Sequence, residues 1–429
     1  MTAIAQQEVA LAYGRGWITV PLAGRDPLVV APDDPPPLGD PEAAVSAALR
    51  APLGCAPLRD LVRDGDRVVI SVCDGTRPQP RRVVLPPLLD EIAAVAPAAD
   101  ITLVIATGTH RGNTPVELAE MFGERLLARV RVVNHDSRDD VTLVDVGSFG
   151  AGVRLELDRE WIDADVRITT GFVEPHFFAG FSGGPKMVVP GLAGLRTVMT
   201  LHDASRIGDP RATWGPVEDN PVHRDIRACA AAIPPDFALD VLLDRQKRIT
   251  HVYAGELFAM HAAACMSASR IAMRAVPELF DVVITTGSGY PLDQNLYQVV
   301  KGMAAAERIV RPGGTVIVAA ACEDGLPDHG SFATVLGAAS SPKELLDLIG
   351  SNDFSAPDQW QVQILARILS TARVQLYCNG LSPEQVRAAH LDPIADIAEA
   401  VAAAIATAGA DARVCYLPEG PQTIPYVVH

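Results

Sequence analysis

The chain of 429 residues lacks the paired cysteines of a disulfide-stabilised protein or a thiolate metal site. It has seven cysteines, and no two of them form a CxxC pair. An odd number of cysteines without close spacing argues against a disulfide framework. The cysteine pattern therefore favours a reducing, cytoplasmic location.

Long apolar runs are also missing. No stretch approaches the ~20 consecutive apolar residues that a membrane-spanning helix needs. The alanine-rich stretch that begins at Ala400 is interrupted by Gly409. The first residues contain neither the basic nor the apolar part of a secretory signal. We therefore expect neither a membrane partner nor a secretory signal.

Positive charge is scarce. The chain has 36 Lys and Arg against 52 Asp and Glu, a formal net charge of −16. Such a charge repels nucleic acids and anionic membranes. An anionic substrate would need cations placed locally to overcome this background. The oligomeric state stays open.

Several common cofactor motifs are absent. No GxGxxG lies between a predicted strand and a predicted helix, which disfavours an ordinary NAD-dependent dehydrogenase. There is no GxxxxGK[ST] phosphate loop and no HExxH zinc motif. Any nucleotide or metal site must therefore be built differently.

The length and composition favour two globular domains. Hydrophobic residues make up 48% and charged residues 21% of the chain, which fits a soluble globular protein and not a disordered one. A chain of this length exceeds what one hydrophobic core normally supports. We place the boundary near residue 275, which gives an N-terminal domain over 1–275 and a C-terminal domain over 276–429.

Apolar runs alternate with amphipathic stretches in both halves, which predicts an α/β fold with two mainly parallel sheets and a ligand cleft between the domains. A hairpin is expected over 10–22, followed by a proline-rich loop over 31–41. Predicted strands cover 67–73, 101–106, 130–134, 165–170, 281–287, 373–378 and 412–417. Predicted helices cover 83–96, 114–123 and 294–310, and further helices begin at Ser382 and Asp392.

Ligands of open α/β sheets bind beyond the carboxyl ends of the strands. Four loops at such ends carry polar or titratable groups. Their sequences are DGTRPQP from Asp74, TGTHRG from Thr107, GFVEPHFFAGFSGGPK from Gly171 and SGYPLDQNLYQVVKG from Ser288.

Two histidines, His110 and His176, each follow a predicted strand. Imidazole titrates near neutral pH and suits proton transfer in either direction. A pair on opposite sides of one carbon would serve two stereochemical approaches. Each histidine alone is more easily explained as a loop cap, but the pair at strand ends favours a catalytic function.

Lys186 follows Gly183, Gly184 and Pro185 in an apolar loop. Small residues let the backbone approach a ligand closely. A lysine there could bind phosphate or, if desolvated, form a covalent bond. A surface lysine after a tight turn is the alternative.

His202 could be a metal ligand, because neutral imidazole suits zinc, copper and nickel. No second histidine lies within a helical turn of it, so this residue alone is better explained as a buried or capping histidine. A metal bound there would need its other ligands from distant residues or from a cofactor.

Arg77 and Lys301 are the predicted anion-binding residues, since a guanidinium can grip a carboxylate with two hydrogen bonds. Gln298 lies three residues before Lys301, so the two share a helix face. A solvated helix face is the alternative for Lys301.

With these motifs assembled, the chain resembles the lactate racemase family, the 2-hydroxyacid racemases that use a nickel-pincer nucleotide. The resemblance rests on DGTRP (74–78), TGTHR (107–111), EPHFFAGFSGGPK (174–186), His202 and GYPLDQNLYQVVKG (289–302). It covers both predicted domains, of which the first would bind the cofactor and the second would contribute substrate-site residues.

The resemblance implies roles for the cofactor-binding residues. Lys186 matches the lysine that links to the nicotinate-derived mononucleotide, and His202 matches the protein ligand of its nickel. Asp74 and Thr76 lie in the phosphate or substrate region of the first motif. Gly183, Gly184 and Tyr297 complete the predicted cofactor site.

The resemblance also implies a mechanism. His110 and His176 match two acid/base histidines, and Arg77, Gln298 and Lys301 match contacts to a small anionic 2-hydroxy acid. One histidine takes the hydroxyl proton while the C2 hydride moves to the cofactor, and a transient 2-keto acid then accepts hydride on its other face. Enzymes of cofactor synthesis are implied partners.

Two alternatives stay open. The same chemistry could act on larger hydroxy acids or sugar acids. The chain could instead hold the pincer nucleotide without turnover, although such a carrier would not need two acid/base histidines.

Overall fold

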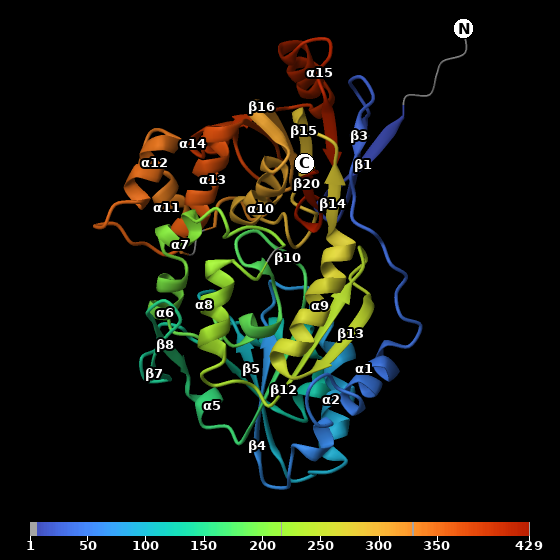
Figure 1. Cartoon of the computed structure of the whole chain (residues 1–429), viewed down its shortest axis with the longest axis vertical. Coiled ribbons are helices and arrows are strands. Elements are labelled where there is room, and N and C mark those ends of the chain that lie inside the picture. Colours follow the sequence, from blue (N-terminus) through green and yellow to red (C-terminus); the bar gives the residue numbers. More distant parts are fainter. Residues whose placement is uncertain (1–6, 216, 328–329, 429) are drawn as a thin grey trace.

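The computed structural model describes residues 7–215, 217–327 and 330–428. Its two largest sheets have six strands each, and Figure 1 shows them in the lower and upper parts of the molecule. The first sheet has the order β13 (Ile249–Gly255), β12 (Phe237–Leu243), β9 (Val166–Phe172), β4 (Arg67–Cys73), β5 (Asp100–Ala106) and β6 (Arg131–Asn134). The second has the order β18 (Asp392–Pro393), β17 (Arg373–Tyr377), β16 (Val310–Ala319), β15 (Phe280–Thr286), β19 (Val414–Leu417) and β3 (Leu28–Val29).

Both sheets are mainly parallel, as predicted. In the first sheet, β12 and β13 pair antiparallel, while β12, β9, β4, β5 and β6 run parallel. All pairs of the second sheet are parallel. The central strand β4, RVVISVC, is buried at every position after Arg67, because helices cover both faces of a parallel sheet.

Four smaller antiparallel or parallel pairs complete the strands. They are β1 (Glu8–Tyr13) with β2 (Gly16–Pro21), β7 (Leu143–Phe149) with β8 (Val153–Asp158), β10 (Pro175–His176) with β11 (Gly180–Phe181), and β14 (Met273–Val276) with β20 (Ile424–Val427). The first of these is the hairpin predicted over 10–22, with Tyr13 opposite Gly16.

Helices surround the two sheets. The α-helices of the N-terminal part are α1 (Pro41–Arg50), α2 (Arg81–Ala93), α3 (Pro115–Phe122), α4 (Glu124–Leu127), α5 (Arg159–Ile162), α6 (Leu195–Leu201), α7 (Ala204–Gly208), α8 (Pro221–Ala230) and α9 (Leu257–Ala272). Those of the C-terminal part are α10 (Leu296–Glu307), α11 (Phe332–Leu336), α12 (Pro342–Ile349), α13 (Gln359–Thr371), α14 (Pro383–Ala388) and α15 (Ile397–Ala408). Short 3₁₀ turns occur at Leu58–Asp60, Gly184–Met187 and Gly420–Gln422.

The N-terminal segment belongs spatially to the second sheet. Strand β3 pairs with β19, and Val9, Leu11 and Val20 pack in one cluster with Val282. Figure 1 shows β1 and β3 in blue beside the C-terminal elements. The division at residue 275 predicted from the sequence therefore does not describe residues 8–29, which cross over to the C-terminal core.

The predicted start of one helix is wrong. Asp392 and Pro393 form the short strand β18, and the helix begins only at Ile397, where the side chain of Asp396 accepts from the Glu399 amide. A proline directly after an acidic residue is also the sequence pattern of a helix N-terminus, with the acidic residue as N-cap and proline at the first helical position. The helix opened by Ser382 is confirmed, with a complete capping box that includes Gln385.

No helix in the described ranges is long and apolar enough to cross a membrane.

Helix α10 packs closely against the end of β15, and this contact generates a stability prediction. A methyl group added at Gly302 would overlap the carbonyl oxygen of Thr286. Helix propensity alone would make Gly302→Ala stabilising by about 1 kcal/mol. We expect the overlap to dominate, so that Gly302→Ala lowers the free energy of unfolding by ~1–3 kcal/mol in urea denaturation.

Gly16→Ala is the matched control, because a methyl group there meets no atom within 4 Å. A Gly302→Ala protein as stable as wild type would show that α10 is not held against β15 in this way.

Candidate active site in the cavity between the two sheets

The carboxyl ends of β4, β5 and β9 lie at one edge of the first sheet because these strands are parallel neighbours. The loops that follow them line a cavity whose opposite wall comes from α10 and α13 of the C-terminal part. Of the predicted site residues, the following line the cavity: Asp74, Arg77, His110, His176, Gly183, Lys186, His202, Tyr297, Gln298 and Lys301. The fold thus brings ten of the predicted site residues to one cavity.

Two predicted residues are placed differently. Thr76 lies in an adjoining groove, and its hydroxyl donates to Asp74 Oδ1 at 2.8 Å. Gly184 lies behind the loop, where its amide donates to the buried Asp240 carboxylate at 2.6 Å. Each of these residues therefore forms a hydrogen bond to a neighbouring carboxylate, Thr76 to Asp74 and Gly184 to Asp240, and does not line the cavity itself.

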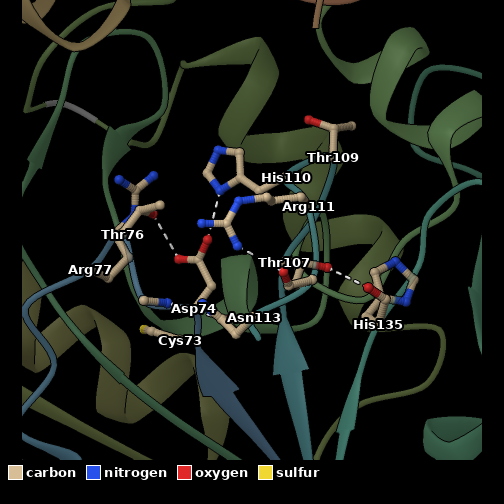
Figure 2. Close-up of polar contacts among 12 residues, drawn as sticks. Cys73, Asp74, Thr76, Arg77, Thr107, Thr109, His110, Arg111, Asn113 and His135 are labelled. Atoms are coloured by element: carbon tan, nitrogen blue, oxygen red, sulfur yellow. Dashed lines mark hydrogen bonds and ion pairs between the residues drawn. The ribbon is translucent and has the colours of Figure 1, made fainter. Parts of the chain in front are cut away.

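His110 is paired with a carboxylate. Its Nδ1 lies 2.7 Å from Oδ2 of Asp74, and Figure 2 shows Thr76 on the other carboxylate oxygen. Burial alone would raise the pKa of Asp74, but His110, Arg77 and the Thr76 hydroxyl outweigh it and lower that pKa to about 2. An ionised Asp74 accepts a hydrogen bond from the Nδ1–H of His110, which leaves the Nε2 lone pair of His110 available to act as a base.

The sequence did not predict this pairing, since the two residues lie 36 positions apart. It also changes the expected role of Asp74. An ionised carboxylate repels phosphate, so the geometry favours orientation of His110 over contact with a phosphate group.

His176 sits in a contrasting environment. It belongs to the β10–β11 pair, and its ring lies 4.5 Å from Phe178 between ring centroids. Its Nδ1 accepts from the Ala179 amide at 3.3 Å. Burial, followed by the charges of Lys186, Lys301 and other neighbouring basic groups, lowers the pKa of His176 well below its usual value, so this imidazole is neutral.

Two lysines line the cavity. Burial, with a smaller effect of Arg77, lowers the pKa of Lys186 to about 7, and the same two causes lead for Lys301, whose pKa is also about 7. Lys301 Nζ donates to Gln298 Oε1 at 2.6 Å, which confirms that the two share a helix face. An amine that is partly neutral near pH 7 is a competent nucleophile.

Arg77 provides a third cation. Its Nη1 is buried and, within the described part of the chain, has no hydrogen-bond partner. An unpaired buried donor is costly, and an anionic ligand would satisfy it. The cavity is therefore locally positive although the whole chain is strongly acidic.

His202 is fixed in one orientation at the end of α6. Its Nδ1 lies 2.8 Å from the carbonyl oxygen of Val198, so Nδ1 carries the proton and Nε2 keeps its lone pair. Burial, followed by the charge of Lys186, lowers the pKa of His202 to about 4. A neutral imidazole with a fixed tautomer is the form that binds metal ions.

A metal held by His202 would need further ligands from outside the protein. Among the described residues, no group of three or more His, Cys, Asp or Glu side chains is placed to hold a metal ion.

An aromatic wall closes the cavity. The Trp360 indole donates to the Tyr297 hydroxyl at 3.0 Å, and its ring centroid lies 4.7 Å from that of His202. Trp214 and Gln422, which sequence reasoning missed, also line the cavity, and Gln422 donates to Glu174 at 3.4 Å. Neither lies in a motif, so no sequence signal marked them.

With this geometry established, comparison with known proteins gives a consistent result. Models of the lactate racemase N-terminal and C-terminal domains match residues 13–215 and 276–424. The chain belongs to the lactate racemase family. Lactate racemases are isomerases, and this homologue is an isomerase of the same family.

Individual relatives support the family assignment. The chain is 38% identical to the lactate racemase of Thermoanaerobacterium thermosaccharolyticum over 386 residues, which cover 89% of this chain and 90% of that protein. It is 37% identical to the lactate racemase of Lactiplantibacillus plantarum over 379 residues, which cover 88% and 89%.

Solved structures agree. The lactate racemase apoprotein from T. thermosaccharolyticum superposes with a TM-score of 0.92 at 35% identity, over 98% of this chain and 100% of that chain. A Thermotoga maritima protein superposes with a TM-score of 0.70 at 19% identity, over 91% and 99%, and shows the shared fold alone.

The lowered pKa of Lys186 generates a chemical prediction. Acylation of Lys186 by a small reagent should become faster with pH only up to about pH 8 and then level off, because its amine is then neutral. The internal control is Lys343, whose side chain is 81% exposed and whose pKa is raised by its hydrogen bond to Asp347. Its rate should still rise about tenfold per pH unit.

Peptide mass spectrometry after timed labelling measures both rates in one sample. Parallel pH profiles for Lys186 and Lys343 would contradict the desolvated environment assigned to Lys186.

Proposed function

We propose that the protein racemises a small 2-hydroxy acid of lactate-like size, with a nickel-pincer nucleotide as cofactor. The observation that carries the proposal is the arrangement of two unlike imidazoles, His110 and His176, with the Arg77 guanidinium around one cavity. A racemase needs proton transfer on two faces of one carbon, and an anion-binding group to hold the substrate between them.

The residues present fit the proposed cofactor. Lys186 offers a partly neutral amine for a covalent link, and His202 offers one fixed imidazole nitrogen as a nickel ligand. Gly183 lines the same cavity and lets the backbone approach a ligand closely. When bound, the nucleotide would supply the acceptor and donor of hydride at the substrate C2.

The protein groups would divide the remaining work. Arg77 and Lys301 would hold the substrate carboxylate, because their charges face a poorly hydrated cavity where ionic attraction is strong. His110 and His176 would remove and return the hydroxyl proton. Phe177, Phe178 and Trp360 would exclude water, which keeps a transient keto acid in place.

A wider polar groove adjoins the cavity and supports a second substrate class. It is lined by Thr109, Asn113, Gln294 and Asn295, next to Asp74 and His110. A longer polar substituent, as in a sugar acid, would extend into it. A substrate screen should therefore include sugar acids beside lactate. The natural setting of such a reaction would be the cytoplasm, with enzymes of cofactor synthesis as partners.

The histidine assignments can be tested by substitution. In protein loaded with cofactor, His110→Ala and His176→Ala should each lower the racemisation rate by ~10²–10⁴-fold, because each removes one acid/base group. Chiral chromatography of D- and L-lactate after incubation with one enantiomer measures the rate. His251→Ala is the control, since His251 lies in a separate surface pocket.

Unchanged racemisation in either cavity variant would remove that histidine from the mechanism. If fully loaded wild-type protein interconverts the enantiomers of none of the tested 2-hydroxy acids, the proposed activity is wrong.

A further inference from the structure

Arg81 is a buried arginine just outside the cavity. It is the first residue of α2 and only 6% exposed. It does not line the cavity but borders the adjoining groove. Arginine is seldom buried without a carboxylate partner, so its contacts call for an explanation.

Every hydrogen bond of the Arg81 guanidinium in the described structure goes to a backbone carbonyl oxygen. Nε and Nη2 donate to the carbonyl of Cys73 at 3.0 and 2.9 Å, and Nη2 also donates to that of Asp74. Nη2 reaches the carbonyl of Arg77 at 3.2 Å, and Nη1 that of Gln79 at 3.3 Å. One side chain thus binds four carbonyls of the loop 73–79.

These contacts supply hydrogen-bond donors to backbone carbonyls of the loop. Strand β4 ends at Cys73, and the carbonyls that follow lie in a loop and not in a ladder. Those of Asp74 and Gln79 accept from the backbone amides of Arg77 and Arg81 at 3.2 and 2.9 Å. A carbonyl oxygen has two lone pairs, and a further donor stabilises it where it is buried. The planar fork of arginine satisfies several of them at once, which one lysine ammonium cannot reproduce in the same geometry.

Gln79 ties the same loop to the sheet. Its side-chain oxygen accepts from the Cys73 amide at 3.0 Å, and its side-chain nitrogen donates to Thr170 Oγ1 on β9 at 3.1 Å. The loop is therefore held from inside by Arg81 and from β9 by Gln79, while its side chains Asp74 and Arg77 line the cavity.

We propose that Arg81 is a positioning residue that holds the loop 73–77 so that Asp74 meets His110 and Arg77 faces the cavity. What the cavity binds rests on the proposed function, but the positioning of Asp74 does not. Burial without an ion pair has a cost, and the alignment of two active-site side chains gives a functional reason for retaining it.

The test compares Arg81→Lys with Arg82→Lys. Arg82 is the adjacent residue of α2, is exposed, and donates to the carbonyls of Ala119 and Glu120 away from the loop. Both substitutions keep the charge and remove the fork, but Arg81→Lys releases buried carbonyls of the loop 73–79, whereas Arg82→Lys releases carbonyls of α3 from an exposed side chain.

The first readout uses the protein without cofactor. Ring ¹⁵N chemical shifts of His110 report which nitrogen carries the proton, and the Asp74 contact selects Nδ1. Arg81→Lys should move the His110 shifts toward the Nε2-protonated form, as Asp74→Asn should, while Arg82→Lys should leave them at wild-type values. A racemisation assay of loaded protein should then show a loss of kcat/KM on the order of 100-fold for Arg81→Lys alone.

Wild-type His110 shifts in folded Arg81→Lys protein would overturn the proposal, whatever the protein's activity. If Arg81→Lys does not fold, Arg81→Gln, which keeps two side-chain donors, takes its place in the same comparison. If His110 shifts change equally in the Arg81 and Arg82 variants, the effect comes from α2 in general and the proposal is wrong.

Discussion

Desolvated positive charge is the constraint on which the rest of this site depends. Arg77, Lys186 and Lys301 face one cavity in a chain whose net charge is −16. Burial, with a smaller effect of Arg77, lowers the pKa of both lysines to about 7, so these two amines are partly charged and partly neutral at physiological pH, while Arg77 stays charged. Each buried charge without a partner costs several kcal/mol, and an anionic ligand offsets part of this cost. The architecture therefore favours an anion in the cavity.

The two histidines lie in different environments. Burial, and after it the neighbouring cations, lowers the pKa of His176 and keeps it neutral, whereas His110 is oriented by its contact with Asp74. Two chemically identical side chains thereby receive different environments, and such differences give titratable pairs unlike proton affinities. His202 differs from both of these histidines. Its Nδ1 donates to the Val198 carbonyl, which leaves the lone pair of its Nε2 available to a metal.

The sequence predicts a large part of this structure. Strands β4, β5 and β9 are recognisable because short, almost fully buried apolar runs end at polar loops, and their parallel pairing brings those loops to one edge. For this reason the residue pattern alone assigns His110, His176 and Lys186 to one site. The family resemblance supplies the roles that residue chemistry leaves open, notably for His202.

Other features could not be predicted, for physical reasons. The two-residue strand β3 has too short a pattern to reveal that the N-terminal segment joins the second sheet. Asp392 and Pro393 have the local sequence of a helix start, but they pair with β17 as the short strand β18. Local residue preferences do not reveal such a pairing with a distant strand. The Asp74–His110 pair and the four carbonyls of Arg81 depend on the three-dimensional path of loops, which residue spacing does not encode.

The proposed cofactor site, in which His202 binds nickel and a nucleotide is anchored nearby, can be tested by one measurement. That measurement is nickel per chain after co-expression with the enzymes of pincer synthesis, for wild type and His202→Ala side by side. We expect nearly one nickel per wild-type chain and its loss in the variant, with a similar melting temperature for both. No nickel in wild type, while a known lactate racemase loads normally under the same conditions, would contradict the proposed cofactor site.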